Sequence, residues 1–185
     1  MLYTRKGDSG STKDFNSKPG ERKSKSSCQT ESLGALDELG AFLGLTKLRS
    51  AEVSWLVDGD KPVDIILWAQ NCLFTVQAEV AGADKRVGHE KVMEMERWID
   101  WTEKELPPIK TFFISGGTEL AALFDVSRTL ARKAERRVIA GAEAKEFVVA
   151  PDTLAFLNRL SSLFYAFARL TNHKSGITEQ PPTYQ

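Results

Sequence analysis

The sequence contains few residues of the types that build metal centres or disulfide frameworks. Its 185 residues include only two cysteines, Cys28 and Cys72, and two histidines. Neither cysteine belongs to a Cys-x-x-Cys pair, and the histidines are isolated. This spacing argues against a structural zinc site and against a disulfide scaffold. A reducing compartment therefore fits the cysteine content, and we expect no protein-built metal site.

An excess of charge of either sign is also absent. Lys and Arg together number 25, as do Asp and Glu. Without a net field, the chain has no global attraction for nucleic acid or for an anionic membrane, so any anion site must be local. No apolar run reaches the roughly 18 residues of a spanning helix, and the first residues lack a secretory apolar region. We expect a cytoplasmic protein with one domain over residues 1–185.

Apolar residues recur with helical spacing in five segments, roughly 29–49, 62–82, 89–106, 118–141 and 151–172. Pro62 and Pro151 are well placed to open helices, Thr118 to cap an N-terminus, and Gly141 to end the fourth segment. No alternating pattern of useful length predicts a strand, although "IKTFFISGGT" is expected to be extended. Short connections between long amphipathic helices predict an all-α fold, a five-helix bundle.

Both ends of the chain are polar. Residues 1–27 include "TRKGDSGST" and bury too little apolar surface to fold alone, so they form either a frayed terminus or a loop ordered around something polar. Consecutive Gly, Ser and Thr residues can direct amides and hydroxyls at phosphate, and Asp8 could hold a hydrated Mg²⁺. The nearby basic residues Arg22, Lys23 and Lys25 are typical of solvated surface. Residues 173–185 are expected to form a flexible tail.

The fourth helical segment carries Arg128, Arg132 and Arg136 at intervals of four, with Glu135 on the same stripe. Like charges four residues apart repel one another on a helix. A phosphate chain would relieve this repulsion, because guanidinium groups bind phosphate oxygens in bidentate fashion. Alternatively, the stripe is a solvated face paired with acids of a neighbouring helix, and spacing alone favours this second interpretation.

Two further helical features admit a structural or a functional interpretation. Asn158 lies in a polar stripe of the fifth segment; if it is buried, its amide needs a partner, which is either a neighbouring helix or a polar ligand. Alone, the pattern favours a hydrogen bond to a neighbouring helix over one to a ligand. Gly34 lies between Glu31 and Glu38 inside the first segment, where glycine costs about 1 kcal/mol relative to alanine. That cost suggests a close approach, for example by a second subunit.

Together, five stretches resemble the PduO-type ATP:corrinoid adenosyltransferases in order along the chain. They are "YTRKGDSGST", "GERKSK" leading into "ESLGALDEL", "FFISGGTELA", "SRTLARKAERRV" and "FLNRLSSLF". The resemblance implies a five-helix bundle that assembles as a homotrimer. It also implies transfer of the 5′-deoxyadenosyl group of ATP to cobalt of a reduced corrinoid, cob(I)alamin, which yields adenosylcobalamin and triphosphate. Its implied partners are a flavoprotein or other reductase and an adenosylcobalamin-dependent enzyme.

The resemblance also assigns roles to particular residues. Asn158 would hold the nucleotide, Asp37 would meet Arg128 across a subunit interface, and Phe112 would lie against the lower face of the corrin. Arg128, Arg132 and Phe112 form the implied catalytic set. The other implied nucleotide-binding residues are Thr4, Arg5, Gly7, Asp8, Gly10, Thr12, Lys13, Lys25, Lys133, Glu135 and Arg136.

The chemistry implied by the resemblance needs no Ser, Cys or His nucleophile, because cobalt(I) itself attacks. The protein must align the reacting carbon and stabilise the charge that grows on the triphosphate, with the arginine stripe, Lys25 and Mg²⁺. An apolar group such as Phe112 that displaces the lower cobalt ligand would ease reduction. Without the resemblance, Phe112 would be interpreted as a plain core residue.

The chain departs from the usual family pattern in several places. "KDFNSKPGER" is longer than the usual glycine-rich "GLFGGER". Single-residue departures are Gln29, Gly40, Ser115, Lys133 and Ser162. Two other hypotheses are therefore a non-catalytic carrier or sensor that binds corrinoid or ATP, and a purely structural helical bundle.

Overall fold

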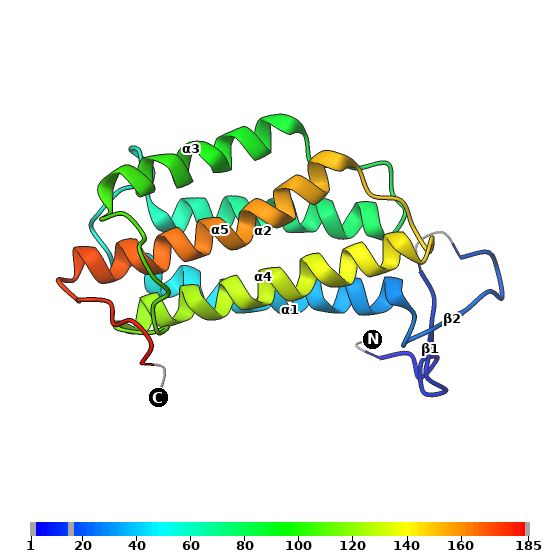
Figure 1. Ribbon diagram of the computed structural model, residues 1–185. Helices are drawn as coiled ribbons and strands as arrows, with labels where there is room; N and C mark the ends of the chain where they lie inside the picture. Colours follow the sequence, from blue (N-terminus) through cyan, green and yellow to red (C-terminus); the bar gives the residue numbers. More distant parts are fainter. Residues whose placement is uncertain (1–2, 15–16, 184–185) are drawn as a thin grey trace.

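The structure is a computed structural model that describes residues 3–14 and 17–183. Five helices account for most of the chain (Figure 1). They are α1 (Cys28–Ser50), α2 (Pro62–Val80), α3 (His89–Glu105), α4 (Glu119–Glu143) and α5 (Pro151–Lys174). The predicted all-α bundle is confirmed, and the predicted helix ends differ from these by no more than two residues. Tyr184 and Gln185, at the end of the predicted tail, lie outside the described residues.

A short hairpin is present that the sequence did not predict. Strands β1 (Ser11–Thr12) and β2 (Lys23–Ser24) pair antiparallel, with Ser11 opposite Ser24 and Thr12 opposite Lys23. Each strand is too short to show an alternating pattern. Figure 1 shows this N-terminal segment beside the start of α1 and the end of α4.

The helix ends follow from local chemistry, with one correction. The Thr118 hydroxyl accepts a hydrogen bond from the Ala121 amide, as expected of an N-cap, and Pro62 and Pro151 open their helices. Gly141 is not the C-cap of α4, because the helix continues to Glu143. A Cβ at Gly141 would lie 2.3 Å from Cε1 of Phe147, so glycine is required there for close packing.

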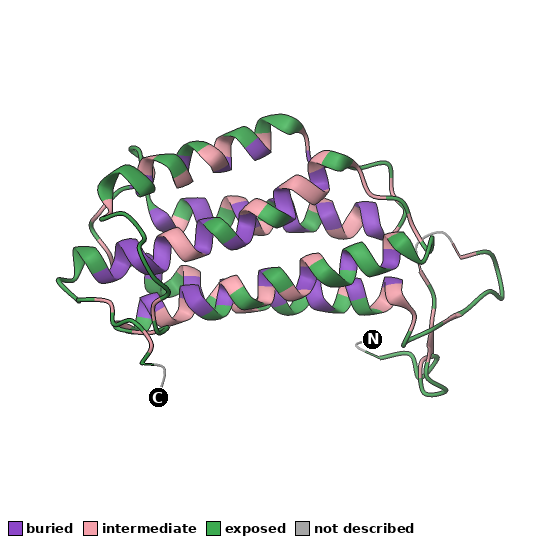
Figure 2. Cartoon of the chain, viewed as in Figure 1, coloured by how far each residue is buried: buried purple, intermediate pink, exposed green. Residues whose placement is uncertain are grey.

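The core lies between the helices, with α4 packed against both α1 and α5, α2 against α1, and α3 against α5. Buried residues line the inner faces in Figure 2. The rings of Phe124 and Phe167 meet edge-on at 5.4 Å, and Phe124 stacks on Phe164 at 6.4 Å. Both ring contacts join α4 to α5. Within the described ranges, no helix has the length and apolar character needed to cross a membrane.

Candidate functional site

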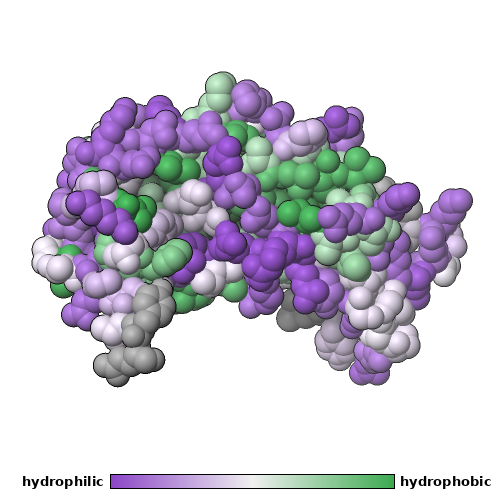
Figure 3. Space-filling view, in the orientation of Figure 1, coloured by the Kyte–Doolittle hydropathy of each residue, from purple (hydrophilic) through white to green (hydrophobic). Residues whose placement is uncertain are grey.

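A cavity of about 710 Å³ opens between α4, α5 and the segment that precedes α4. Arg128 and Arg132 line it from α4, Ser162 and Tyr165 from α5, and Phe112 from the preceding segment. Figure 3 shows hydrophilic side chains gathered over the middle of α4 and α5. Because its side chain is 79% exposed, Phe112 is not a core residue, and that interpretation of the sequence was wrong.

The three arginines of the α4 stripe differ in their partners. Arg128 Nε donates to Asp125 Oδ1 over 3.3 Å, and its guanidinium lies 6.0 Å from the ring centroid of Tyr165. Arg132 and Arg136 are exposed and make no ion pair or hydrogen bond with any described residue. Acids of a neighbouring helix therefore do not neutralise these two guanidinium groups. They remain able to bind an anion.

The acids of α1 pair instead with a second basic row on α4. Glu38 binds Lys133, and Glu31 lies 3.6 Å from Arg137. These four residues line a second cavity, of about 460 Å³, together with Gly34 and the N-terminal residues Thr12 and Lys25. No atom lies within 4 Å of a Cβ built at Gly34, so packing within the chain does not require glycine there.

Asn158 is exposed, so its amide is not a buried group that requires a partner. Its Nδ2 donates to Glu135 Oε1 over 2.9 Å, and its Oδ1 accepts from Arg159 over 2.7 Å. The amide thus links α5 to α4 at the surface. This contact places two of the expected nucleotide-binding residues side by side.

The N-terminal segment is folded on itself. Arg22 makes it compact: its guanidinium donates to Ser11 Oγ and to the carbonyl oxygens of Ser11 and Lys6. Lys25 lies over Gly7, where a Cβ would come within 3.0 Å of its Nζ. Arg5 adopts a φ of 57°, a conformation that costs non-glycine residues energy and is found at functional sites.

Arg22 is exposed, as the clustering of basic residues suggested, whereas Lys23 is half-buried. Lys23 Nζ lies 2.6 Å from Asp14 Oδ2 and 2.8 Å from Gln29 Oε1. The Lys23 hydrogen bond, followed by that of Ser17, lowers the pKa of Asp14 below its usual value. Gln29 also donates to the Val80 carbonyl over 2.7 Å. Gln29 stands where the family often has an arginine. Its neutral amide can accept a hydrogen bond from a lysine, whereas an arginine could not.

One chain does not bring all the expected site residues into a single cavity. Phe112, Arg128 and Arg132 line the first cavity, and Thr12, Lys25 and Lys133 line the second. Helix α4 separates the two sets. Asp37 is exposed on α1 and forms no ion pair within the described part of the chain. The remaining N-terminal candidates lie on the folded segment beside the second cavity: Thr4, Arg5, Gly7, Asp8, Gly10 and Lys13.

Sequence reasoning missed the residue that joins the two parts of the first cavity. The other oxygen of Asp125, Oδ2, accepts from the Gly116 amide over 3.2 Å, so Asp125 connects Arg128 to the segment carrying Phe112. A buried aspartate on an amphipathic helix gives no sequence signal of its partners. The glycines of "SGGT", both at positive φ, were the nearest indication of a tight turn.

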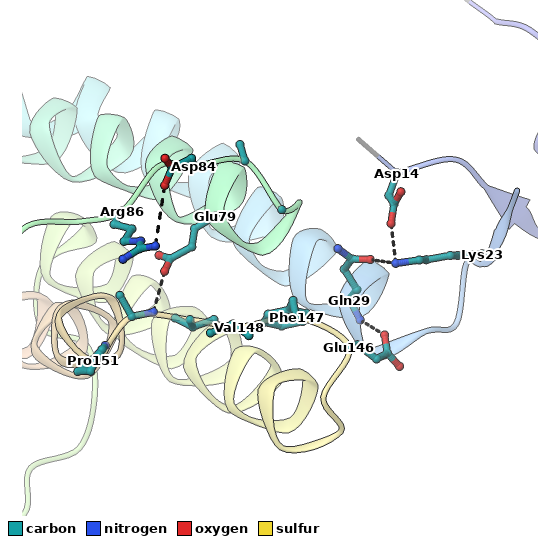
Figure 4. Close-up of a pocket in the computed structure, with 14 residues that line it drawn as sticks. Asp14, Lys23, Gln29, Glu79, Asp84, Arg86, Glu146, Phe147, Val148 and Pro151 are labelled. Carbon is teal, nitrogen blue, oxygen red and sulfur yellow. Dashed lines mark hydrogen bonds and ion pairs between the residues drawn. The ribbon is translucent and has the colours of Figure 1, made fainter. Parts of the chain in front are cut away.

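A third crevice, of about 670 Å³, lies at the end of the bundle shown in Figure 4. Most of its polar side chains are engaged within the protein. Glu79 accepts from the Ala150 amide over 2.7 Å and from the Thr153 hydroxyl over 2.6 Å, and Glu146 accepts from the Cys28 and Gln29 amides. These carboxylates satisfy helix N-termini. The carboxylates of this crevice therefore have a structural role, the capping of α1 and α5.

The residues present fit a magnesium ion bound together with phosphates. No group of three or more His, Cys, Asp or Glu residues gathers anywhere in residues 3–14 and 17–183. Asp8 supplies an exposed carboxylate that has no ion-pair partner among those residues. Mg²⁺ is usually held by one or two carboxylates, water and substrate phosphates. Asp8 can provide the protein's share of such a site.

Comparison with known proteins gives a consistent result. A family model described as cobalamin adenosyltransferase matches residues 2–171. The corrinoid adenosyltransferase of Bacillus subtilis (strain 168) is 37% identical over 180 residues, which cover 95% of this chain and 89% of that protein. The corrinoid adenosyltransferase PduO of Citrobacter freundii is 32% identical over 93% of this chain, which spans only 50% of that protein.

Solved structures agree with the sequence relatives. A variant of the PduO-type ATP:corrinoid adenosyltransferase from Lactobacillus reuteri, complexed with cobalamin and ATP, superposes with a TM-score of 0.84. It is 26% identical, and the match covers 98% of this chain and 96% of that chain. The five helices, the arginine stripe and these similarities lead to one conclusion: the chain belongs to the cobalamin adenosyltransferase family.

Proposed function

We propose that the protein transfers the 5′-deoxyadenosyl group of ATP to cobalt of a reduced corrinoid and releases triphosphate. The observation that carries this proposal is the pair of exposed arginines, Arg132 and Arg136, without anionic partners in the described chain, beside a cavity that carries an exposed Phe112. The cationic row suits the polyphosphate of ATP, and the apolar ring beside it suits the corrin ring.

The cationic row would bind the polyphosphate. Negative charge grows on the triphosphate as the carbon–oxygen bond of ATP breaks, and fixed guanidinium groups stabilise that charge without reorganising. Lys25 and the amides of the N-terminal segment would hold the remaining phosphate oxygens. Mg²⁺, held by Asp8 and the phosphates, would supply further positive charge there.

The aromatic side of the cavity would receive the corrin ring. Phe112 points away from the core, and Phe113 and Tyr165 line the same cavity. An apolar ring under the corrin would displace the lower ligand and make cobalt easier to reduce. The chain then has only to align the reduced cobalt with C5′ of ATP, since cobalt is the nucleophile.

We propose that the complete site forms between two copies in a homotrimer. The Thr12–Lys25 cavity of one copy would face the Arg132–Phe112 cavity of its neighbour, so the two sets of residues that α4 separates would meet. Asp37, which has no ion-pair partner in the described chain, would then pair with Arg128 of the neighbour. Arg128 keeps guanidinium donors available beyond its Nε contact with Asp125.

The reaction places the protein between two other activities. A flavoprotein or other reductase must deliver the electron that produces cobalt(I), and an adenosylcobalamin-dependent enzyme would use the product. Both partners, and a cytoplasmic location where ATP is available, belong to this proposal.

An assay with chemically reduced cobalamin, ATP and Mg²⁺ tests the proposal. We expect a light-sensitive cobalt–carbon bond, seen by absorption, and one triphosphate per bond, identified by chromatography. Formation of neither product would reject adenosyl transfer. Tight binding of ATP or corrinoid without product would favour a non-catalytic carrier instead, and no ATP-dependent rise in melting temperature would favour a structural bundle.

A further inference from the structure

The segment that carries Phe112 has no regular structure of its own. Residues 107–118 form neither a helix nor a strand, and Phe112 and Ile114 are both largely exposed. Core packing therefore cannot fix the direction of the Phe112 ring. The segment must be positioned from outside, and its contacts come from α5, from the residues after α5 and, at the Gly116 amide, from Asp125 of α4.

Arg169 on α5 holds the first half of the segment. Only 5% of the residue is exposed. Its Nη2 donates to the Pro107 carbonyl over 3.2 Å, its guanidinium lies 5.1 Å from the ring centroid of Phe113, and its Nε donates to Glu179 Oε2 over 2.9 Å. A buried guanidinium requires such partners because an unpaired buried charge is strongly unfavourable. One side chain thus joins α5, the Phe112 segment and the C-terminal segment.

Asn172, three residues further along the same face of α5, holds the second half. Its Nδ2 donates to the Gly116 carbonyl over 2.8 Å, and its Oδ1 accepts from the Thr118 amide over 3.2 Å. A Cβ at Gly117 would lie 2.4 Å from that Oδ1, so the backbone of the segment packs directly against the side-chain amide of Asn172.

The C-terminal segment, residues 175–183, completes the enclosure. The Gln180 carbonyl accepts from the Ile114 amide over 2.9 Å, and the side chain of Glu179 is only 16% exposed against Arg169. Figure 1 shows this segment beside the one that precedes α4. The fixed points at Pro107, Phe113, Ile114 and Gly116 lie on both sides of Phe112.

We propose that Arg169, paired with Glu179, is a positioning residue for Phe112, and that residues 175–183 support the corrinoid half of the site from outside its cavity. The Arg169–Glu179 pair holds the C-terminal segment against the Phe112 segment and so keeps the ring directed over the α4–α5 cavity. This inference rests on the proposed function. It predicts that loosening the pair affects the corrinoid step and spares ATP, because neither residue contacts Arg132, Arg136 or the N-terminal segment.

Glu179→Gln tests the inference, since Glu179 lies outside the helices and the substitution keeps the shape of the side chain and an amide oxygen that can accept from Arg169. The first measurement is hydrogen exchange of the Ile114 amide, which the Gln180 carbonyl holds, and it needs no substrate. We expect faster exchange at Ile114 and unchanged exchange in α4 and at the Gly116 amide, which donates to Asp125 on α4. The matched control is Lys174→Gln, which breaks the Lys174–Glu105 pair between α5 and α3 without a contact to residues 107–118.

The second measurement separates the two substrates. In Glu179→Gln, we expect kcat with reduced corrinoid to fall about 10- to 100-fold, the scale on which a misplacement near 1 Å affects a reaction. The KM for ATP should stay within twofold, and Arg169→Lys, which keeps the charge but loses the planar fork, should behave in the same way.

Three results would overturn the inference: unchanged amide exchange in Glu179→Gln, an equal loss for ATP and corrinoid, or an equal effect of Lys174→Gln. An inactive wild-type protein would reject the proposed function instead, and the exchange measurement would still decide whether Arg169 and Glu179 hold the Phe112 segment.

Discussion

Asp125 and Arg128, one turn apart on α4, form an ion pair with Nε 3.3 Å from Oδ1. The pair fixes Arg128, while Arg132 and Arg136 extend from the same face without a partner in the described residues. One arginine of the stripe is thus held as part of the cavity wall, and the other two remain available. This difference within one row predicts different effects of mutation.

Arg132→Ala should weaken the use of ATP strongly. A charge-assisted hydrogen bond contributes about 1.5–3 kcal/mol, so we expect kcat/KM for ATP to fall about 10- to 100-fold. The melting temperature without ATP should not fall, because the guanidinium has no partner to lose within the described chain. Kinetics at varied ATP and a thermal melt check both points.

The control for Arg132→Ala is Arg49→Ala, which removes an exposed arginine that pairs with Glu52 and Glu119 near the other end of α1. Arg49→Ala should leave kcat/KM for ATP unchanged. An unchanged kcat/KM in Arg132→Ala would contradict the assignment of the stripe to phosphate.

Phe112→Ala should spare ATP binding and impair the corrinoid step. The side chain is 79% exposed, so its removal should change the free energy of unfolding by no more than about 0.5 kcal/mol. Loss of the ring would leave the lower cobalt ligand in place, which makes reduction harder. The spectrum of bound cob(II)alamin and the rate with a weak reductant measure this effect.

Phe74→Ala on α2 is a matched control for Phe112, because that phenylalanine is 70% exposed and lies away from the cavity. It should leave both substrates unaffected. If Phe112→Ala abolished ATP binding and left corrinoid handling normal, the two halves of the site would be assigned the wrong way round.

The features that can be predicted from the sequence are those set by contacts between residues close together in the chain. Helical spacing predicts α1 to α5 because it is local, and Thr118 caps α4 for the same reason. Gly141 was misread because its need for glycine comes from Phe147, six residues away in the next loop. The spacing of Arg128, Arg132 and Arg136 is visible in the sequence, but it cannot show that the acids of α1 pair with Lys133 and Arg137 instead.

Acid should destabilise the connection between α1 and α2 through Asp60. Hydrogen bonds from Arg97 and then Trp98 lower the pKa of Asp60 below its usual value. A carboxyl whose pKa is lower in the folded state contributes stability above its unfolded pKa, near 4, and that contribution is lost as pH falls through the folded value.

In Asp60→Asn, the pH dependence of stability below about pH 4 should flatten. Urea unfolding at pH 2.5, 4 and 7 measures it, with Asp84→Asn as a control because that side chain is 98% exposed and lies 3.9 Å from Arg86. An Asp60→Asn curve parallel to that of the wild type would show that the Arg97 contact has no energetic effect.

Glu79→Ala should destabilise the fold and leave catalysis intact. The carboxylate is buried and accepts from the Ala150 amide and the Thr153 hydroxyl, so its removal leaves two donors without an acceptor at the start of α5. Buried donors without partners cost about 1–3 kcal/mol, and the N-terminus of a helix also loses a favourable negative charge. Urea unfolding should show this loss, whereas Glu143→Ala, at the exposed end of α4, should not.

Because the crevice around Glu79 is explained by helix capping, KM for ATP and for corrinoid should stay within twofold of the wild type in Glu79→Ala. A large rise in either KM without a loss of stability would instead identify this crevice as part of the substrate site.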